Sequence, residues 1–193
     1  TLEVARIYCG DGIVDYLSLS QGNFNSIDTH LPDRRWPLLA FQELHARFKA
    51  VAHGVPVVAS TRIQGPEDAE QVISAGEADM VGMCRALLVD PQWPAKAERG
   101  EPERIRRCIA CNQCWAWIST GEPIACATNP VAGKEHLWPP LERDRAEEAK
   151  KVVVVGGGPG GLEAARVASA RGHHVVLFEQ HAELGGRLKH VHE

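Results

Sequence analysis

The stretch KVVVVGGGPGGLEAARVASARGHHVVLFEQ, residues 151–180, predicts a strand, a glycine-rich turn, a helix and a second strand. Lys151–Val155 is apolar after its first residue, as in a buried strand of a parallel sheet. Small apolar residues follow the turn at helical positions, and Val175–Phe178 reads as the next strand. This order predicts the start of an α/β domain in which a helix crosses between two parallel strands.

The turn itself contains a nucleotide-binding pattern. Gly156, Gly158 and Gly161 satisfy G-x-G-x-x-G, between an apolar strand and a helix, and Glu179 ends the following strand. Glycines there permit a tight turn, close approach of a pyrophosphate, and close helix–strand packing, while the acid can bind a ribose. A second glycine pair follows in ELGGR. The pattern predicts a Rossmann-like site for FAD, NAD(P) or ADP, formed by Gly156, Gly158, Pro159, Gly160, Gly161, Glu179, Gly186 and Arg187.

Upstream, residues 108–126 read CIACNQCWAWISTGEPIAC and bring four cysteines close together. Cys108, Cys111, Cys114 and Cys126 have the spacing C-x2-C-x2-C-x11-C. Three thiolates on two short steps can surround one side of a compact metal centre, and the fourth closes it, as a [4Fe–4S] cluster requires. Zinc is the alternative, although its structural sites usually use two separated pairs of ligands. Buried or disulfide-paired thiols fit this dense clustering poorly.

Composition narrows the class of protein. The chain has 193 residues, 44% of them hydrophobic, and a formal net charge of -4. The mild acidity argues against nucleic acid as the main partner. No apolar run is long enough to cross a bilayer, so we expect no membrane association. Clustered cysteines without a disulfide pattern indicate a reducing compartment, and we expect a cytoplasmic protein.

Residues 1–97 alternate short apolar runs with amphipathic stretches, which predicts parallel βα units. Three such strands cannot close a barrel alone, so they need partners outside the chain. The chain also begins without methionine and ends soon after a motif, and we expect an internal fragment of a longer protein. The predicted strands are Val14–Ser20, Val55–Ser60 and Ala78–Met83, and the predicted helices are Pro37–Ala52 and Pro66–Gly76.

In this order the features resemble the iron–sulfur flavoenzymes related to trimethylamine dehydrogenase, histamine dehydrogenase and bacterial 2,4-dienoyl-CoA reductase. Their N-terminal barrel resembles Old Yellow Enzyme. Residues 56–94 are similar to the last two units of this barrel, residues 106–126 to its [4Fe–4S] segment, and residues 152–179 to the start of its FAD or ADP domain. The resemblance implies that the three N-terminal strands are the sixth, seventh and eighth of a TIM (β/α)8 barrel.

The resemblance also implies an FMN phosphate site in the turns after the last two barrel strands, where such barrels bind phosphate. Arg62 follows one of these strands and Arg85 the other, and two arginines can bind a phosphate together. The family usually has glycine or a small residue before each arginine, whereas this chain has Thr61 and Cys84, whose side chains could crowd the phosphate. The implied FMN contacts are Ser60, Thr61, Arg62, Met83, Cys84 and Arg85.

The implied cofactors are FMN, a [4Fe–4S] cluster, and FAD, ADP or NAD(P) at the glycine-rich turn. The favoured function is an amine dehydrogenase or N-demethylase that passes electrons from substrate through FMN and cluster to an external acceptor, such as an electron-transfer flavoprotein. One alternative is an NAD(P)H-dependent enoyl reductase; another is a non-catalytic electron-transfer module. The substrate would be a small molecule, an amine or an enoyl compound. We expect the full-length protein to be a homo-oligomer.

The loop Ser20–Pro37 would lie at the mouth of the active site. We expect Trp115 and Trp117 to pack over the cluster. No catalytic acid or base is identified, His30 and His45 being the nearest candidates, so we expect the isolated 193 residues to be inactive. Plausible substrate-side residues in the loop are Asn23, Phe24, Asn25, His30 and Trp36.

The chain divides into three expected parts. Residues 1–97 form the C-terminal part of the FMN barrel, residues 98–148 the cluster segment and a linker, and residues 149–193 the first βαβ unit of the nucleotide domain. Pro139 and Pro140, followed by mixed charge, suit a linker.

Overall fold

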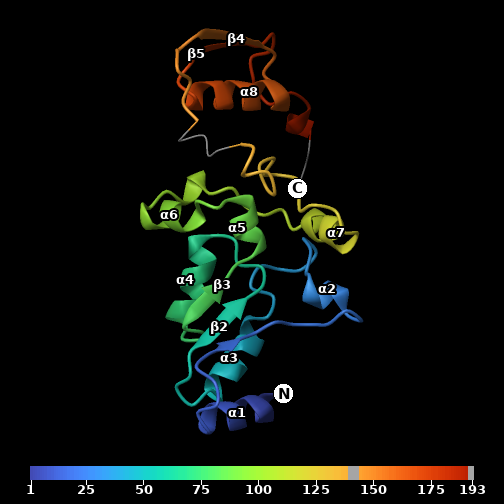
Figure 1. Ribbon diagram of the computed structural model, residues 1–193, viewed down its shortest axis with the longest axis vertical. Coiled ribbons are helices and arrows are strands. Elements are labelled where there is room, and N and C mark those ends of the chain that lie inside the picture. The colour runs from blue at the N-terminus through green and yellow to red at the C-terminus, as the bar shows by residue number, and fades with distance from the viewer. Residues whose placement is uncertain (139–143, 191–193) are drawn as a thin grey trace. The chain divides into compact units, whose positions relative to one another are not determined.

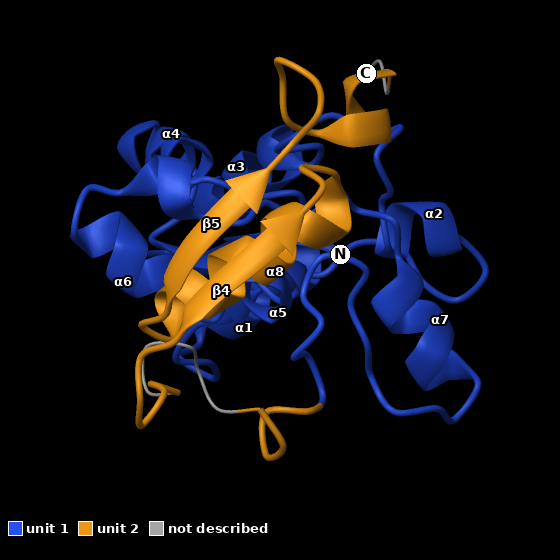
Figure 2. Cartoon of the chain, turned by 90° about the horizontal axis from the view of Figure 1, so that it is seen from above, with its two compact units in different colours: residues 1–133 blue, residues 134–193 orange. Residues whose placement is uncertain are grey.

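A computed structural model describes residues 1–138 and 144–190. The chain forms two compact units, Thr1–Gly133 (the first unit) and Lys134–Glu193 (the second unit) (Figure 2). The cysteine segment therefore folds with the predicted barrel units. Pro139 and Pro140, predicted to lie in a linker, fall outside the described residues.

The first unit is built on a three-stranded parallel sheet (Figure 1). Its strands β1 (Leu17–Ser18), β2 (Val57–Ser60) and β3 (Met80–Gly82) lie in the order β1-β2-β3. Each lies inside a predicted run, which confirms the parallel βα reading. β1 is shorter than predicted, and it lies at the edge of the sheet beside β2.

Helices cross between the strands, α3 (Gln42–Ala50) before β2 and α4 (Pro66–Ser74) before β3. α3 begins five residues later than predicted, because Leu39 has a positive φ of 55° that a helix does not allow. α4 begins at Pro66 as predicted, and the Asp68 carboxylate accepts the backbone N–H groups of Gln64 and Gly65 at 2.8 and 2.9 Å. That capping contact fixes the chain directly after β2.

The sheet and its crossover helices share one apolar core. Its buried members are Cys9, Ala52, Val57, Ala59, Val72 and Ala78. Further helices of the first unit, not predicted from the sequence, are α1 (Leu2–Gly10), α2 (Ile27–His30), α5 (Arg85–Val89), α6 (Trp93–Glu98) and α7 (Gln113–Ser119), with a 3-10 turn at Pro102–Arg104. α2 and α7 lie side by side in both views (Figures 1 and 2).

The second unit has the predicted strand–turn–helix–strand order. β4 (Lys151–Val155) and β5 (His174–Phe178) are parallel, with Lys151 opposite His174 and Val155 opposite Phe178. α8 (Pro159–Ala170) covers one face of this sheet, and a 3-10 turn follows at Gly186–His190 (Figure 2). The other face leaves Val155 and Phe178 84% and 59% exposed.

None of the helices in the described ranges combines the length and apolar character needed to span a bilayer.

A buried carboxylate holds the start of the cysteine segment. Asp90, just after α5 and 1% exposed, accepts hydrogen bonds from Lys96 Nζ at 2.6 Å and from the Arg106 backbone N–H at 3.0 Å. Burial alone would raise the pKa of Asp90, but its hydrogen bonds to Lys96 and Arg106 outweigh that effect and lower it. The ionised carboxylate therefore stabilises the fold and orients the chain that leads to Cys108.

We predict that Asp90→Ala lowers the free energy of unfolding by about 3–5 kcal/mol, because it leaves Lys96 without its buried partner. Since folding lowers the pKa of Asp90 below its ordinary 3.8, its contribution is present above that value and is lost as pH falls through the folded-state pKa. Denaturant unfolding at pH 7 and at pH 3 measures both effects. Glu3→Ala, which removes an exposed ion pair with Arg6, is the control and should change little. Equal stability of Asp90→Ala and wild type at pH 7 would contradict this account.

Candidate functional site

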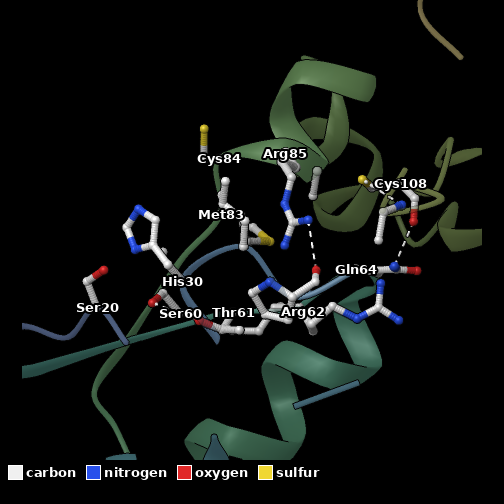
Figure 3. A pocket seen from close by; sticks show the side chains of 16 residues that line it. Ser20, His30, Ser60, Thr61, Arg62, Gln64, Met83, Cys84, Arg85 and Cys108 are labelled. Atoms are coloured by element: carbon white, nitrogen blue, oxygen red, sulfur yellow. Dashed lines mark hydrogen bonds between the residues drawn. The ribbon is translucent and has the colours of Figure 1, made fainter. Parts of the chain in front are cut away.

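A cavity of about 460 Å³ lies where β2 and β3 end (Figure 3). We call it the arginine pocket. Because the carboxyl ends of parallel strands meet at one edge of the sheet, the two turns that follow these strands converge there. All six predicted FMN contacts line it: Ser60, Thr61, Arg62, Met83, Cys84 and Arg85.

The two arginines are held in this pocket by neutral groups. Arg62 Nη2 donates to the Trp36 carbonyl at 3.1 Å, and Arg85 Nη1 donates to the Pro32 carbonyl at 2.9 Å and to Asn112 Oδ1 at 2.5 Å. Within the described ranges neither makes an ion pair with a carboxylate, and the buried Arg62 Nε has no hydrogen-bond partner. Burial lowers the pKa of Arg62, and the charge of Arg85 lowers it further. An anion in the pocket would relieve both costs.

The turn after β2 has an unusual backbone. Thr61 and Arg62 both have positive φ, 86° and 59°. Thr61 is β-branched, for which this conformation is strongly unfavourable. Two side-chain hydrogen bonds hold the turn: Thr61 Oγ1 donates to Gln21 Oε1 at 2.5 Å, and Ser60 Oγ donates to the Leu19 carbonyl at 2.6 Å. The backbone explains why glycine would suit position 61.

Cys84, the other departure from the family pattern, does not crowd the arginines. It is exposed, and its sulfur points away from Arg62 and Arg85 (Figure 3). Its φ of -92° is ordinary, so the turn after β3 does not need glycine at this position.

The four cysteines line a second cavity, which we call the cysteine pocket. Cys108, Cys111, Cys114 and Cys126 all contribute to it. Between them, Ala110 and Asn112 have positive φ of 49° and 56°, which lets the short loop fold around the space. The Ala110 N–H points to Cys108 Sγ at 3.4 Å. Burial raises the pKa of Cys114, and the neighbouring Cys108 and Cys126 add to this, so a thiolate there needs a cationic partner.

The geometry of the cysteine pocket bears on the choice between a cluster and zinc. Among residues 1–138 and 144–190, no group of three or more His, Cys, Asp or Glu side chains could hold one metal ion. The ligands of a single zinc ion must all lie about 2.3 Å from it, if they are thiolates. The four thiolates of a [4Fe–4S] cluster instead bind four different irons and stand further apart. Cluster and zinc thus place different demands on the spacing of the four sulfurs.

The two pockets are neighbours, and sequence reasoning missed the residues that join them. Arg85 and Cys108 line both. Asn112, between Cys111 and Cys114, accepts from Arg85 and donates to the Leu31 carbonyl at 2.7 Å. Gln64 Nε2 donates to the Cys108 carbonyl at 2.6 Å (Figure 3). A polar residue that tolerates positive φ, placed between cysteines, was the available signal for Asn112.

Aromatic side chains gather beside the arginine pocket. Phe24, in the loop after β1, and His30, the last residue of α2, both lie against Trp115 of α7. Their ring centroids are 6.3 and 6.2 Å from that of Trp115. Neither Trp115 nor Trp117 lines the cysteine pocket, and Trp117 is 39% exposed, so their packing over a cluster stays a prediction. Of the other loop residues, Trp36 packs on Phe41 at 5.4 Å, while Asn23 and Asn25 are exposed and bond to each other.

In the second unit the glycine-rich turn has the predicted geometry. Gly156 has a φ of 99°, and a Cβ on Gly161 would overlap the Gly156 carbonyl oxygen, so both positions require glycine. Pro159 begins α8, Gly160 lies in its first turn, and Gly186 lies against Gly158. Arg187 lies in the 3-10 turn after Gly185, whose N–H donates to the Gly157 carbonyl at 2.8 Å.

Glu179 is turned back onto this glycine turn. One carboxylate oxygen accepts the Gly157 N–H at 2.6 Å and the other accepts the His181 N–H at 3.0 Å. These hydrogen bonds, that from His181 first, lower the pKa of Glu179. The acid therefore stays ionised beside the turn, where a ribose contact was predicted.

Comparison with known proteins agrees with this geometry. Residues 12–104 match the NADH:flavin oxidoreductase / NADH oxidase family, and residues 154–193 match the NAD(P)-binding Rossmann-like domain. The chain is 37% identical over 189 residues to an N,N-dimethylglycine/sarcosine dehydrogenase of Chromohalobacter salexigens, covering 96% of this chain and 27% of that protein.

Solved structures are also similar. Histamine dehydrogenase from Rhizobium sp. 4-9 matches with a TM-score of 0.84 and 31% identity, over 96% of this chain and 27% of that one. A 2-naphthoyl-CoA reductase complex matches with a TM-score of 0.86 and 32% identity, over 97% of this chain and 28% of that one. The chain thus spans little more than a quarter of the length of these relatives. The predicted resemblance to histamine dehydrogenase and its flavin-dependent relatives is confirmed.

If the cysteine pocket holds a [4Fe–4S] cluster, anaerobically purified intact protein should contain about four irons per chain with matching acid-labile sulfide. Replacing Cys111 or Cys114 by serine should reduce the iron content sharply. Cys9→Ala, which changes a buried cysteine outside the pocket, is the matched control and should keep the iron. One zinc per chain, without iron or sulfide, would contradict the cluster.

Proposed function

Because residues 12–104 match the NADH:flavin oxidoreductase / NADH oxidase family, we propose that the whole protein is an FMN- and [4Fe–4S]-dependent oxidoreductase. Its favoured type is an amine dehydrogenase or N-demethylase. The observation that carries the proposal is a pair of arginines in one pocket at the strand ends, directly beside four cysteines. Within the part of the chain that the structure describes, neither arginine has a carboxylate partner. The three strands of the first unit would be the sixth to eighth of an FMN-binding (β/α)8 barrel.

Arg62 and Arg85 would hold the FMN phosphate. The orphaned Arg62 Nε supplies a buried donor, and the Arg85 guanidinium is already oriented by Pro32 and Asn112. The two guanidinium groups lie in a partly desolvated pocket, where charge-assisted contacts with a phosphate are strongest. Ser60 and Thr61 line the same edge and fix the turn that carries Arg62.

Cys108, Cys111, Cys114 and Cys126 would hold the cluster. When bound, a flavin supplies two-electron chemistry toward a substrate, and an iron–sulfur cluster supplies one-electron transfer. The chain's part is to keep the two sites adjacent, through the shared residues Arg85 and Cys108. The glycine-rich turn of the second unit would bind FAD, ADP or NAD(P).

The amine direction has two supports. Two relatives are named for amine substrates, N,N-dimethylglycine or sarcosine in one and histamine in the other. In addition, the contact of Phe24 with Trp115 places aromatic rings beside the arginine pocket, where a substrate ammonium could make cation–π contacts.

Electrons would leave to an external acceptor such as an electron-transfer flavoprotein. The full-length protein would be a cytoplasmic homo-oligomer. An enoyl reductase is the second candidate, favoured by the similarity to 2-naphthoyl-CoA reductase.

Loss of either arginine should weaken FMN binding. We expect Arg62→Ala and Arg85→Ala each to reduce the affinity of the intact protein for FMN by about 1.5–3 kcal/mol, because each removes charge-assisted contacts to the phosphate. Fluorescence titration of the apoprotein with FMN measures this loss. Arg35→Ala is the matched control, since Arg35 is exposed and pairs with Asp33 beside the same loop. Unchanged affinity in both variants would place the phosphate elsewhere.

The direction of the reaction can be read from the flavin absorbance under anaerobic conditions. We expect a secondary or tertiary amine, such as sarcosine or dimethylglycine, to bleach the flavin of the intact protein without NAD(P)H. Riboflavin-loaded bovine serum albumin is a control for chemistry without a site. Bleaching by NAD(P)H alone, with recovery on adding an enoyl thioester, would support the reductase instead.

A further inference from the structure

A buried histidine stands behind the turn that carries Arg62. His45 lies in α3, is 2% exposed, and does not line the arginine pocket. Its Nε2 is 2.7 Å from Nε2 of Gln21, which is itself 7% exposed and follows β1. A buried polar pair that bridges two elements needs an explanation beyond packing, because apolar side chains would fill the same space without the need for partners.

The donors and acceptors in this pair follow from its third member. Gln21 Oε1 accepts the Thr61 hydroxyl, so the Gln21 amide group faces His45 and donates to it. His45 Nε2 must then be the unprotonated ring nitrogen. Burial lowers the pKa of His45, which agrees with a neutral acceptor. The order is Thr61 to Gln21 to His45, with each side chain held by the next.

We call this chain of hydrogen bonds, Thr61–Gln21–His45, the relay. Thr61, at its end, has the backbone conformation that most needs support. Thr61 is β-branched and has a φ of 86°, and its hydroxyl bond to Gln21 holds it in that conformation. If Gln21 turned away, Thr61 could relax to negative φ. Arg62 follows directly with a φ of 59°, so its guanidinium would move out of the pocket.

We propose that His45 is a positioning residue for the anion site: by fixing Gln21 it holds Thr61, and therefore Arg62, in the left-handed backbone that presents Arg62 to the FMN phosphate. This inference rests on the proposed FMN site. It assigns a role to a side chain that touches neither the arginine pocket nor the cysteines.

The test uses glycine, which adopts positive φ freely and needs no support. In the intact apoprotein, His45→Leu should raise the dissociation constant of FMN about tenfold, and Thr61→Val, which removes only the hydroxyl donor, should act similarly. In a Thr61→Gly background the same His45→Leu change should alter the constant by less than about threefold, because the coupling has been removed. His45→Gln restores an acceptor and should recover most of the affinity.

A variant of the apolar core distinguishes a specific loss of Arg62 positioning from a general loss of stability. Val72→Ala removes buried volume in α4, outside the relay, and its thermal midpoint is compared with that of His45→Leu. Equal loss of FMN affinity in both at matched stability would overturn the inference, as would an effect of His45→Leu that persists with glycine at position 61. If His45→Leu does not fold, Thr61→Val and His45→Gln decide: unchanged affinity in Thr61→Val overturns the inference.

The experiments distinguish a failure of the proposed FMN site from a failure of the positioning role of His45. If wild-type protein binds no FMN, or Arg62→Ala leaves binding unchanged, the FMN site is wrong and the inference fails with it. If Arg62→Ala weakens binding while His45→Leu and Thr61→Val do not, the FMN site stands and only the positioning role is overturned.

Discussion

The first unit is organised around two positive charges that its own carboxylates do not neutralise. Arg62 and Arg85 come from turns after adjacent parallel strands, and carbonyl and amide oxygens hold them in place. Such acceptors orient a guanidinium without cancelling its charge, so the pocket keeps a positive potential. The left-handed turn, the Gln21 contact and the capping of α4 all fix the position of one of these arginines. An anion bound between them, as proposed for the FMN phosphate, would neutralise these charges.

The pocket also brings together parts of the chain that are far apart in sequence. Asn112 reaches Arg85 across 27 residues and Leu31 across 81, and Gln64 reaches the Cys108 carbonyl across 44. These bonds attach the cysteine loop to the turns after β2 and β3. Because these hydrogen bonds join the walls of the two pockets, a flavin and a cluster bound in them would stay at a fixed separation.

What the sequence could predict depended on local signals. Apolar runs predicted β2 and β3, the glycine spacing predicted the turn before α8, and strand ends placed Arg62 and Arg85 together. Gln21 and His45 had no such signal, because a buried polar pair is defined only by contact across 24 residues. His45 lies within a helix predicted from apolar spacing, and nothing local marks it as an acceptor. The neighbours of Trp115 had no local signal for the same reason, since Phe24 and His30 come from a distant part of the sequence.

The hydrogen bond between Asn112 and Arg85 bears on how such a protein would respond to oxygen during storage. Exposed iron–sulfur centres are attacked by oxygen, and a loop that loses its metal loses the bonds that hold its shape. Here that loop carries one of the acceptors of Arg85. If the loop holds the proposed cluster and the arginines the proposed phosphate, oxidative damage at the cysteines would therefore reach the neighbouring arginine and loosen its hold on that phosphate. Gradual release of yellow flavin during storage would then report on damage that began at the iron.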